Sequence, residues 1–255
     1  MRFVMTPRDS GGTITKRVAQ PGTGKPPGHD GGSDESGSGL AGSVAAGPGV
    51  LLAPCVTVRH ARRDDPVAGL VYDAAPEAYG AATGSEQAAR AAIEQLWRTP
   101  GHSASFEHAL VAEIGGRVVG VLIGFPVHDR YRLHAALLRK GLRYAGVRRW
   151  PLLLAALPHL VAATPRPPRR AYYVGTIAVA RHARRRDVAS TLGHHAELVA
   201  QSQGFPFIVA HTGSRHLTAR RALERYGLRP IKDRRWGYVL YVKPVDPAAS
   251  VPREV

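Results

Sequence analysis

The chain has 255 residues, a single cysteine and a formal net charge of +16, and hydrophobic residues make up 44% of it. This content is enough for the core of one large domain or two small ones. One cysteine, Cys55, excludes an internal disulfide and fits a reducing compartment, so we expect a cytoplasmic protein. The N-terminus has no continuous apolar region, and no apolar run reaches the ~20 residues of a membrane-spanning helix. We therefore expect neither a signal peptide nor a membrane partner.

The positive charge lies almost entirely after residue 54. Residues 1–54 contain five Lys or Arg and four Asp or Glu, a net charge of +1, which leaves +15 of the total +16 to the rest of the chain. Basic surfaces attract nucleic acid, membranes and small molecules that carry phosphate. The distribution indicates that the charge belongs to the folded domain and not to a basic tail.

Residues 1–54 are predicted to form a disordered extension rich in glycine, proline and serine. They hold twelve of the 28 glycines and one aromatic residue, Phe3. Such a segment cannot bury enough apolar surface to offset the entropy lost on ordering. We expect one domain over 55–243, followed by a loose tail over 244–255.

The first elements of the domain are predicted from hydrophobic periodicity and turn residues. They are, in chain order, a strand over 55–59, a helix over 65–79, a helix over 86–97, and a hairpin of strands over 108–114 and 117–123. Thr83 and Glu86 have capping-box spacing at the start of the second helix, and Pro100 marks its end. Gly115 and Gly116 form the hairpin turn.

Residues 127–170 are predicted to form a basic helical insertion before the central strand. They contain ten Lys or Arg and one acid, Asp129. An amphipathic helix carries Arg132, Arg139 and Arg143 close to one line, a second helix covers 150–161, and a proline-rich connector follows. The basic face is either an ordinary solvated surface or a patch for a polyanion or an acidic substrate.

The central segment is a strand over 172–179 that leads through a turn of arginines into a helix over 188–201. The first N–H groups of a helix have no intrahelical partner, and the helix dipole is positive at that end. Arginines in the turn add charge-assisted hydrogen bonds to phosphate oxygens. This strand, turn and helix are therefore typical of an anion-binding site.

The same segment resembles motif A of the GNAT-type N-acetyltransferase superfamily. In motif A an apolar triplet is followed by (Gln/Arg)-x-x-Gly-x-(Gly/Ala), which binds the pyrophosphate of acetyl-CoA. Here the triplet is Ile-Ala-Val at 177–179, and the loop is Arg-Arg-Arg-Asp-Val-Ala at 184–189. Arg184 and Ala189 match, whereas Asp187 replaces the glycine with a carboxylate that repels pyrophosphate. Aspartate tolerates left-handed backbone and caps helices, so it can also point away from the ligand.

A later segment resembles motif B of the same superfamily, Asn-x-x-Ala-x-x-x-Tyr-x-x-x-Gly-Phe. Aligned on Gly227, Ala219 matches and His216 takes the Asn position. In many members the Tyr protonates the departing thiolate, and here that position is Leu223, which has no proton to donate. Tyr226 is a candidate substitute, and its alternative role is packing under the helix end. Water as the acid, or a thiolate that leaves unprotonated, also remains open.

The resemblance implies that acetyl-CoA is the co-substrate and assigns residues to it. The residues assigned to the cofactor are Ile177, Ala178, Val179, Arg184, Arg185, Arg186, Asp187, Val188, Ala189, Ser190 and His216. Family members polarise the thioester carbonyl with a backbone N–H of the central strand, here that of Val179, while Ile177 meets the pantetheine arm. The motif A helix is followed by a strand over 205–211, a helix over 215–226 closed by Gly227, and a last strand over 236–242.

Acyl transfer to an amine also requires a proton acceptor. The candidates on or near the strands are Glu107, Glu113, Tyr172, Tyr173 and Thr176. We place Glu113 with Tyr226 as catalytic candidates, although a carboxylate beside the hairpin turn is also typical of a solvent-facing residue. No spacing of the twelve histidines is typical of a zinc site, and Ser190, Ser214 and Cys55 lack the neighbours of a catalytic triad. We expect no metal.

The sequence thus predicts an α/β (α+β) domain with a mixed, mostly antiparallel central sheet flanked by helices and a helical insertion before the central strand. The resemblance implies an acetyl-CoA-dependent N-acetyltransferase whose amine acceptor is open, as is the oligomeric state. The alternative is a catalytically impaired, GNAT-like basic module that binds a polyanion such as nucleic acid. Asp187 and Leu223 favour this alternative, whereas the basic insertion lacks the interleaved aromatics of a stacking surface.

Overall fold

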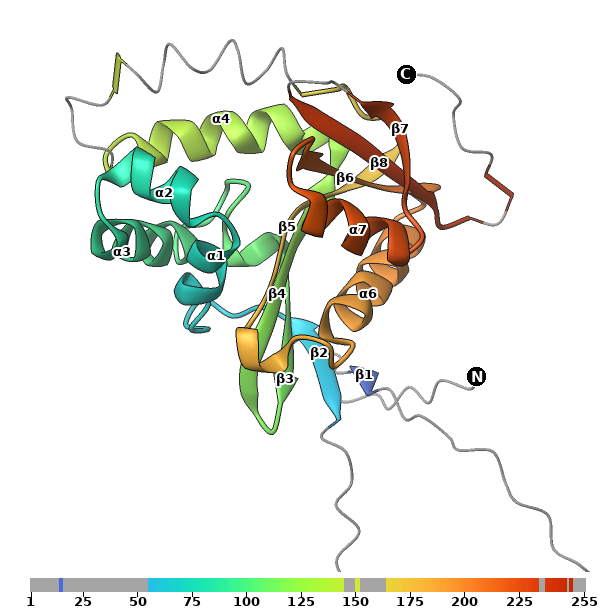
Figure 1. Cartoon of the computed structure of the whole chain (residues 1–255), viewed down its shortest axis with the longest axis horizontal. Helices are drawn as coiled ribbons and strands as arrows, with labels where there is room; N and C mark the ends of the chain where they lie inside the picture. Colours follow the sequence, from blue (N-terminus) through green and yellow to red (C-terminus); the bar gives the residue numbers. More distant parts are fainter. Residues whose placement is uncertain are drawn as a thin grey trace, which may run out of the picture.

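A computed structural model describes residues 14–15, 55–144, 150–151, 164–233, 237–246 and 248–249 (Figure 1). Within these residues the strands form one eight-stranded sheet in the order β1-β2-β3-β4-β5-β6-β8-β7. All neighbouring strands are antiparallel except β5 and β6, which are parallel. The predicted mixed, mostly antiparallel sheet flanked by helices is confirmed.

The segments with apolar periodicity supply most of these elements. The strands are β1 (Ile14–Thr15), β2 (Val56–His60), β3 (Ala109–Ile114), β4 (Arg117–Pro126), β5 (Ala171–Val179), β6 (Phe207–Gly213), β7 (Arg229–Asp233) and β8 (Tyr238–Pro244). The α-helices are α1 (Ala68–Ala74), α2 (Pro76–Thr83), α3 (Glu86–Trp97), α4 (Arg130–Gly141), α6 (Val188–Ser202) and α7 (Leu217–Arg225). Short 3-10 turns are η1 (Phe106–His108), η2 (Val127–Asp129) and η4 (Arg181–Ala183).

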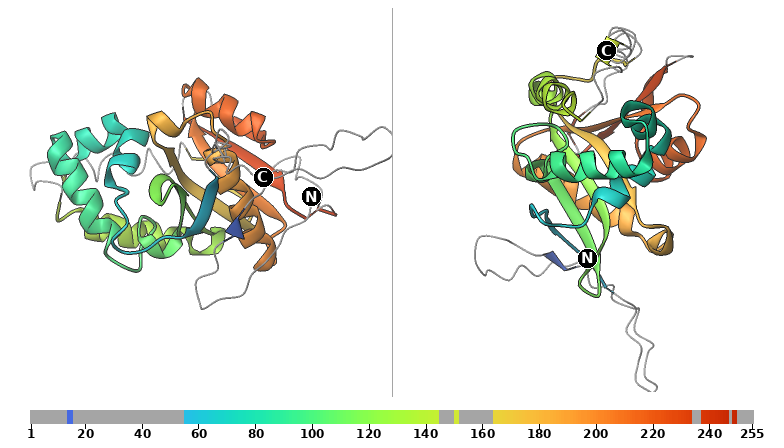
Figure 2. Two further views of the ribbon diagram at one scale, coloured as in Figure 1. Left: turned by 90° about the horizontal axis from the view of Figure 1, so that it is seen from below. Right: turned by 90° about the vertical axis from the view of Figure 1, so that its left-hand side faces the viewer.

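Helices cover both faces of the sheet, so it separates two hydrophobic cores. Leu192 and Ala196 of α6 share one core with Leu122 of β4. Trp97 of α3 lies in the other core with Val121, the residue of β4 that precedes Leu122. Figures 1 and 2 show α1, α2 and α3 on one side of the strands and α6 and α7 on the other. Alternate side chains of β4 therefore anchor opposite layers, as expected for a strand buried on both faces.

Two details of the N-terminal elements correct the sequence predictions. The helix expected over 65–79 is two helices, because Pro76 lacks an N–H and disfavours a helical conformation at Ala75, which has φ −153°. The cap of α3 is Ser85, whose Oγ accepts the N–H of Ala88 at 3.2 Å, and not Thr83. The helix over 86–97 and the Gly-Gly hairpin are confirmed.

The C-terminal elements follow the predicted order, with one strand missed. Gly227 closes α7 with φ +93°, as predicted. β7 contains Pro230 and has no apolar alternation, so its sequence does not indicate a strand. It lies at the edge of the sheet, where proline is tolerated. Most of the predicted extension 1–54, of the second insertion helix 150–161 and of the tail after 244 lies outside the described residues. Within the extension, the described residues Ile14–Thr15 pair with β2.

Candidate functional site

The sheet opens at its centre, where β5 and β6 separate. Parallel pairing joins 171–174 of β5 to 207–210 of β6 and goes no further, although both strands continue. Gly175 bulges out of register with β4, which pairs with Val174 and then with Thr176. We call the diverging ends, 175–179 of β5 and 211–213 of β6, the splay. β5 thus has an open edge in the middle of the sheet.

The exposure of β5 changes at the splay. Its first half is buried, whereas Gly175 is exposed and the Ile177 side chain is 39% exposed. Ala178 and Val179 pack into the two cores on opposite faces, so they present backbone groups to the splay. An exposed isoleucine on a central strand of an otherwise filled sheet is typical of a surface that a ligand covers. An extended ligand can therefore lie along 175–179 and hydrogen-bond to this edge.

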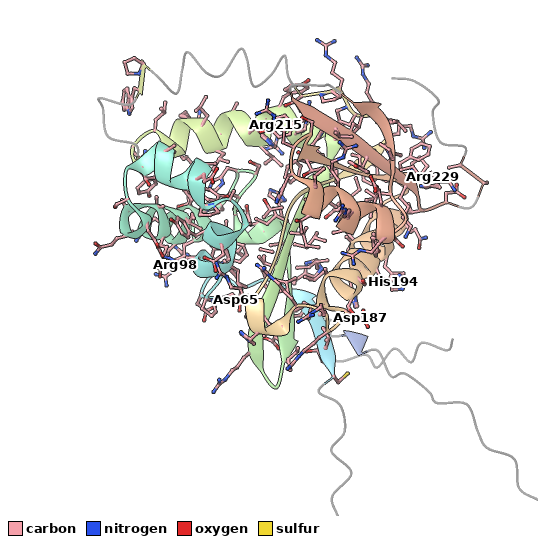
Figure 3. All side chains as sticks on the ribbon, in the orientation of Figure 1. Asp65, Arg98, Asp187, His194, Arg215 and Arg229 are labelled. Atoms are coloured by element: carbon pink, nitrogen blue, oxygen red, sulfur yellow. The ribbon has the colours of Figure 1, made fainter. Side chains whose placement is uncertain are left out.

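The turn between β5 and α6, residues 180–187, is held at both ends and exposed in the middle. We call it the arginine turn. Ala183 and Val188 are buried, and Val188 packs so close to Gly120 of β4 that a Cβ there would lie 2.8 Å from the valine. The side chains of 184–187 are exposed. Figure 3 shows Asp187 at the beginning of α6, far from Arg229 on β7.

The backbone of this turn offers unused donors. The first helical bond of α6 runs from the Thr191 N–H to the Asp187 carbonyl at 2.8 Å. Among the described residues, no acceptor contacts the N–H groups of 185–190. Arg184 donates from Nε to the Val179 carbonyl at 3.3 Å, and no described carboxylate forms an ion pair with the arginines at 184–186. Free N–H groups, a helix N-terminus and unpaired guanidinium groups make an anion site.

Asp187 occupies the glycine position of the motif in the backbone conformation that glycine favours. Its φ is +56°, in the left-handed region, and Arg185 has φ +62°. The tolerance of aspartate for this conformation is therefore confirmed. Its carboxylate makes no cap hydrogen bond to α6, so a capping role for this side chain is wrong.

The motif B residues lie on or next to α7. His216 is the exposed residue that precedes the helix, and Leu223 packs against the core beside α6. Tyr226 lies against Gly193 of α6, where a Cβ would be 2.6 Å from its ring, and the Lys243 ammonium is 4.3 Å from the ring centroid. Burial, and then the Glu197 carboxylate, raise the pKa of Tyr226. A phenol that holds its proton this firmly is a poor acid, so the placement favours the packing role.

The two candidate carboxylates are engaged elsewhere. Glu113 accepts hydrogen bonds from Nη2 and Nε of Arg59 at 2.6 and 3.0 Å, and Arg59 also pairs with Asp65. Arg59 and Glu113 lie on β2 and β3, on the far side of β4 from β5. Glu113 is partly buried, which corrects the expectation of a solvent-facing side chain. Glu107 accepts the Gly101 N–H at 2.7 Å. Neither carboxylate lies on a strand of the splay.

The hydroxyl candidates on β5 point to both faces of the sheet. Tyr172 shares the core of α6, and burial raises its pKa to about 12. Tyr173 is in the opposite core, where burial also raises its pKa. Thr176 is half-buried just after the bulge. All three stay protonated at neutral pH, so none is a ready proton acceptor.

The structure adds a residue that we had weighed only as a metal ligand. His211 is the first residue of β6 beyond the pairing with β5, and its ring centroid is 5.6 Å from that of Tyr173. Its Nε2 is 2.8 Å from the Pro165 carbonyl, which only accepts, so Nε2 carries the hydrogen and Nδ1 has a free lone pair. Nδ1 is buried with no hydrogen-bond partner among the described residues. Burial lowers the pKa of His211 to about 4, which keeps the imidazole neutral.

Other rings surround His211 on this face. Tyr173 contacts Phe125 at 5.4 Å and His134 at 6.2 Å between ring centroids, and burial lowers the pKa of His134. We call His211, Tyr173, His134 and Phe125 the His211 cluster. Its members come from β4, α4, β5 and β6, so no sequence motif contains them together. The described part of the chain has no group of three His, Cys, Asp or Glu placed to hold a metal, and no helix in it is long and apolar enough to span a membrane.

Comparisons with known proteins add a family and a fold. A sequence model described as the Acetyltransferase (GNAT) family matches residues 70–228. No curated protein matches the chain. A structure described as an acetyltransferase is similar with a TM-score of 0.53 and 19% identity, over 74% of this chain and 99% of that one. An N-acetyltransferase from Staphylococcus aureus Mu50 is similar with a TM-score of 0.50 and 18% identity, over 73% and 99%. At these identities the likeness is one of fold.

Proposed function

Because the chain belongs to the GNAT family of acetyltransferases, we propose that it transfers the acetyl group of acetyl-CoA to an amine. The observation that carries this proposal is the continuity of two features. The open edge of β5 leads directly into the arginine turn, where the N–H groups of 185–190 have no acceptor among the described residues. An extended donor with a pyrophosphate at one end matches both features.

The arginine turn binds the pyrophosphate in this proposal. Backbone N–H groups at the start of α6 donate to the phosphate oxygens, and the helix dipole stabilises their charge. Arg184 is positioned by the bond from its Nε to the Val179 carbonyl, which leaves its Nη groups for the phosphates, and Arg185 and Arg186 are also exposed to meet them. Asp187 lowers the affinity by repulsion, without removing the N–H donors.

The pantetheine arm lies along the exposed half of β5, over Ile177. This places the thioester near the apex of the splay, beside Val174 and the bulge at Gly175. The bulge turns backbone N–H groups out of the ladder, and such a group can donate to the thioester oxygen as negative charge develops on it.

His211 is the proton acceptor in this proposal. The amine nitrogen attacks the thioester carbonyl carbon, the carbon–sulfur bond breaks, and CoA leaves as a thiolate. The amine proton passes to Nδ1 of His211, the atom with the free lone pair. Because burial keeps the pKa of His211 near 4, the imidazolium gives the proton up to the thiolate, whose thiol has an ordinary pKa of about 8.5. This route needs no hydroxyl at Leu223.

The test is the release of CoA thiol from acetyl-CoA in the presence of a panel of primary amines, with identification of the N-acetyl product. We expect amine-dependent thiol release that follows the amount of acetylated product. Thiol release without any acetylated amine would contradict transfer to an amine. No thiol release from a protein that binds duplex DNA would favour the basic binding module.

A further inference from the structure

Arg130 is a buried cation that has no anionic partner among the described residues. Arg130 is the first residue of α4, and only 8% of its surface is exposed to solvent. Its guanidinium donates from Nη2 to the Tyr131 hydroxyl at 3.1 Å. Among the described residues, no carboxylate forms an ion pair with it, since the neighbouring Asp129 accepts from Arg132 at 2.9 Å. A guanidinium that has left water usually has a carboxylate or phosphate partner.

Arg130 lies beside the His211 cluster. Its Cζ is 5.8 Å from the ring centroid of Tyr173 and 4.8 Å from that of Tyr131. Its charge also reaches two imidazoles, since after burial it is among the causes that lower the pKa of His134 and His211. Arg130 and the proposed proton acceptor, His211, therefore lie beside the same ring, that of Tyr173.

The surroundings do not neutralise this charge. Burial lowers the pKa of His134 and His211 and raises that of Tyr173, so these neighbours are uncharged at neutral pH. The aromatic faces compensate only in part, because a cation–π contact stabilises a cation by less than its removal from water costs. The position at the N-terminus of α4 adds the positive end of a helix dipole. Both features favour a bound anion.

In the proposed function, acetyl-CoA does not supply the anion that binds Arg130. Its phosphates belong to the arginine turn, which follows the C-terminal end of β5, whereas Arg130 meets Tyr173 in the N-terminal half of the same strand. The acceptor approaches the thioester from the side of His211. An anionic group on the acceptor is thus the group that would meet Arg130.

We propose that Arg130 binds the carboxylate of an amine acceptor of the amino-acid type and so directs its amino group to the splay beside His211. This inference rests on the proposed function and narrows its substrate class. The guanidinium fork matches a planar carboxylate with two parallel hydrogen bonds. The carboxylate is unchanged in the reaction, and the product is an N-acetyl amino acid. Its charge also offsets that of Arg130, which makes His211 a better proton acceptor when the correct acceptor is bound.

The test compares acids with amides that differ only in the charged group. Calorimetry in the presence of CoA measures binding of N-acetyl derivatives of alanine, phenylalanine, lysine and glutamate, each as free acid and as carboxamide. We expect at least one free acid to bind tenfold or more tightly than its amide. O-Phosphoethanolamine and ethanolamine serve as a phosphate-bearing pair. No preference for any free acid, or a larger preference for the phosphate, overturns the proposal.

Variants of two neighbouring arginines locate the preference. In Arg130→Gln the affinity for the free acid should fall to that for the amide, and the affinity for the amide should not change. Arg130→Lys should keep part of the preference for the free acid. Arg132→Gln is the matched control, because Arg132 lies two residues away, exposed, and pairs with Asp129. An acid preference that survives in Arg130→Gln overturns the assignment. If that variant does not fold, Arg130→Lys decides, since binding of the acid as tight as in the parent protein contradicts the bidentate contact.

Acetyl-CoA titrated alone separates the two proposals. A protein that binds acetyl-CoA and shows no acid preference loses this inference and keeps the proposed function. A protein that does not bind acetyl-CoA loses the proposed function, and the inference fails with it.

Discussion

The arginine turn and the His211 cluster lie at the two ends of the splay and differ in how they present charge. The turn is exposed, and it offers backbone N–H groups and arginines that water screens. The cluster is buried and holds neutral imidazoles beside one desolvated cation, Arg130. The many exposed hydrogen-bond donors of the arginine turn suit a long, highly charged co-substrate such as acetyl-CoA. A few desolvated groups suit discrimination between small acceptors, because an unmatched charge there is costly.

The difference also concerns how each region is built. The turn is one continuous segment whose ends are fixed by buried Ala183 and Val188. The His211 cluster is formed by residues of β4, α4, β5 and β6, so it depends on the packing of these four elements. We therefore expect substitutions in the arginine turn to affect acetyl-CoA binding alone. Substitutions in the His211 cluster should affect turnover, the choice of amine acceptor and stability together.

The variant His211→Gln should separate turnover from acetyl-CoA binding most clearly. The amide keeps a donor for the Pro165 carbonyl but cannot take up a proton. General base catalysis contributes roughly 10²–10⁴-fold, so kcat should fall at least ~100-fold while acetyl-CoA binding is unchanged. Steady-state kinetics and calorimetry on the same preparation measure both. An unchanged kcat would remove His211 from the mechanism.

The opposite pattern is expected from the double variant Arg184→Ala, Arg186→Ala. Each charge-assisted hydrogen bond contributes ~1.5–3 kcal/mol, so the Kd for acetyl-CoA should rise by roughly 100-fold or more, and less at high salt. Arg229→Ala is the control, because this exposed arginine lies on the edge strand away from the turn (Figure 3). Equal affinities in the double variant and the parent would mean that these arginines form only a solvated surface.

The pH dependence of the free energy of unfolding tests whether the His211 cluster is shielded from water. The pKa of His211 is about 4 in the folded chain and ~6.5 when unfolded, so the unfolded chain binds more protons between these values. The free energy of unfolding should therefore fall as the pH drops from 6.5 to 4, by at most about 3 kcal/mol from this residue. Denaturant titrations at several pH values should show a shallower loss in His211→Gln. Exposed His182→Gln should follow the parent.

The smallest effect is expected at Asp187. Its side chain caps nothing, and its φ of +56° is easier for glycine, so Asp187→Gly should leave the melting temperature unchanged or slightly higher. Removing a like charge near the pyrophosphate should tighten acetyl-CoA binding a few-fold at low salt. Asp187→Asn isolates the charge, since Asn also accepts this backbone conformation. Weaker binding in both variants would show that the carboxylate helps the donor site.

The two regions also differ in how far the sequence predicts them. Motif A is local, so its strand, arginines and helix could be predicted with their boundaries nearly correct. The left-handed backbone at Asp187 was anticipated, but its cap was not observed, because a side chain's direction depends on the fold. His211 was weighed only as a metal ligand, since the contact with Tyr173 joins residues 38 positions apart. Arg130 was counted as one charge of a basic insertion, and its burial depends on how α4 packs.

The surroundings of the two catalytic candidates, Glu113 and Tyr226, were not predicted for the same reason. Glu113 stands beside a predicted turn, where exposure is common, and only the pairing of β2 with β3 brings Arg59 to it. Tyr226 was chosen for its distance from Leu223 along a helix, and the close approach to Gly193 of α6 decides its environment. Long-range packing, which a single sequence does not express, thus determines which polar groups remain free to react.

The most direct measurement is calorimetric titration of the full chain with acetyl-CoA, desulfo-CoA and duplex DNA at physiological salt. We expect one site that binds acetyl-CoA and desulfo-CoA with similar affinity, because the arginine turn and the open edge of β5 hold parts that both ligands share. We also expect that duplex DNA does not displace them. Binding of DNA with no heat from either CoA ligand would contradict a donor site at the splay and leave a basic binding module on an acetyltransferase fold.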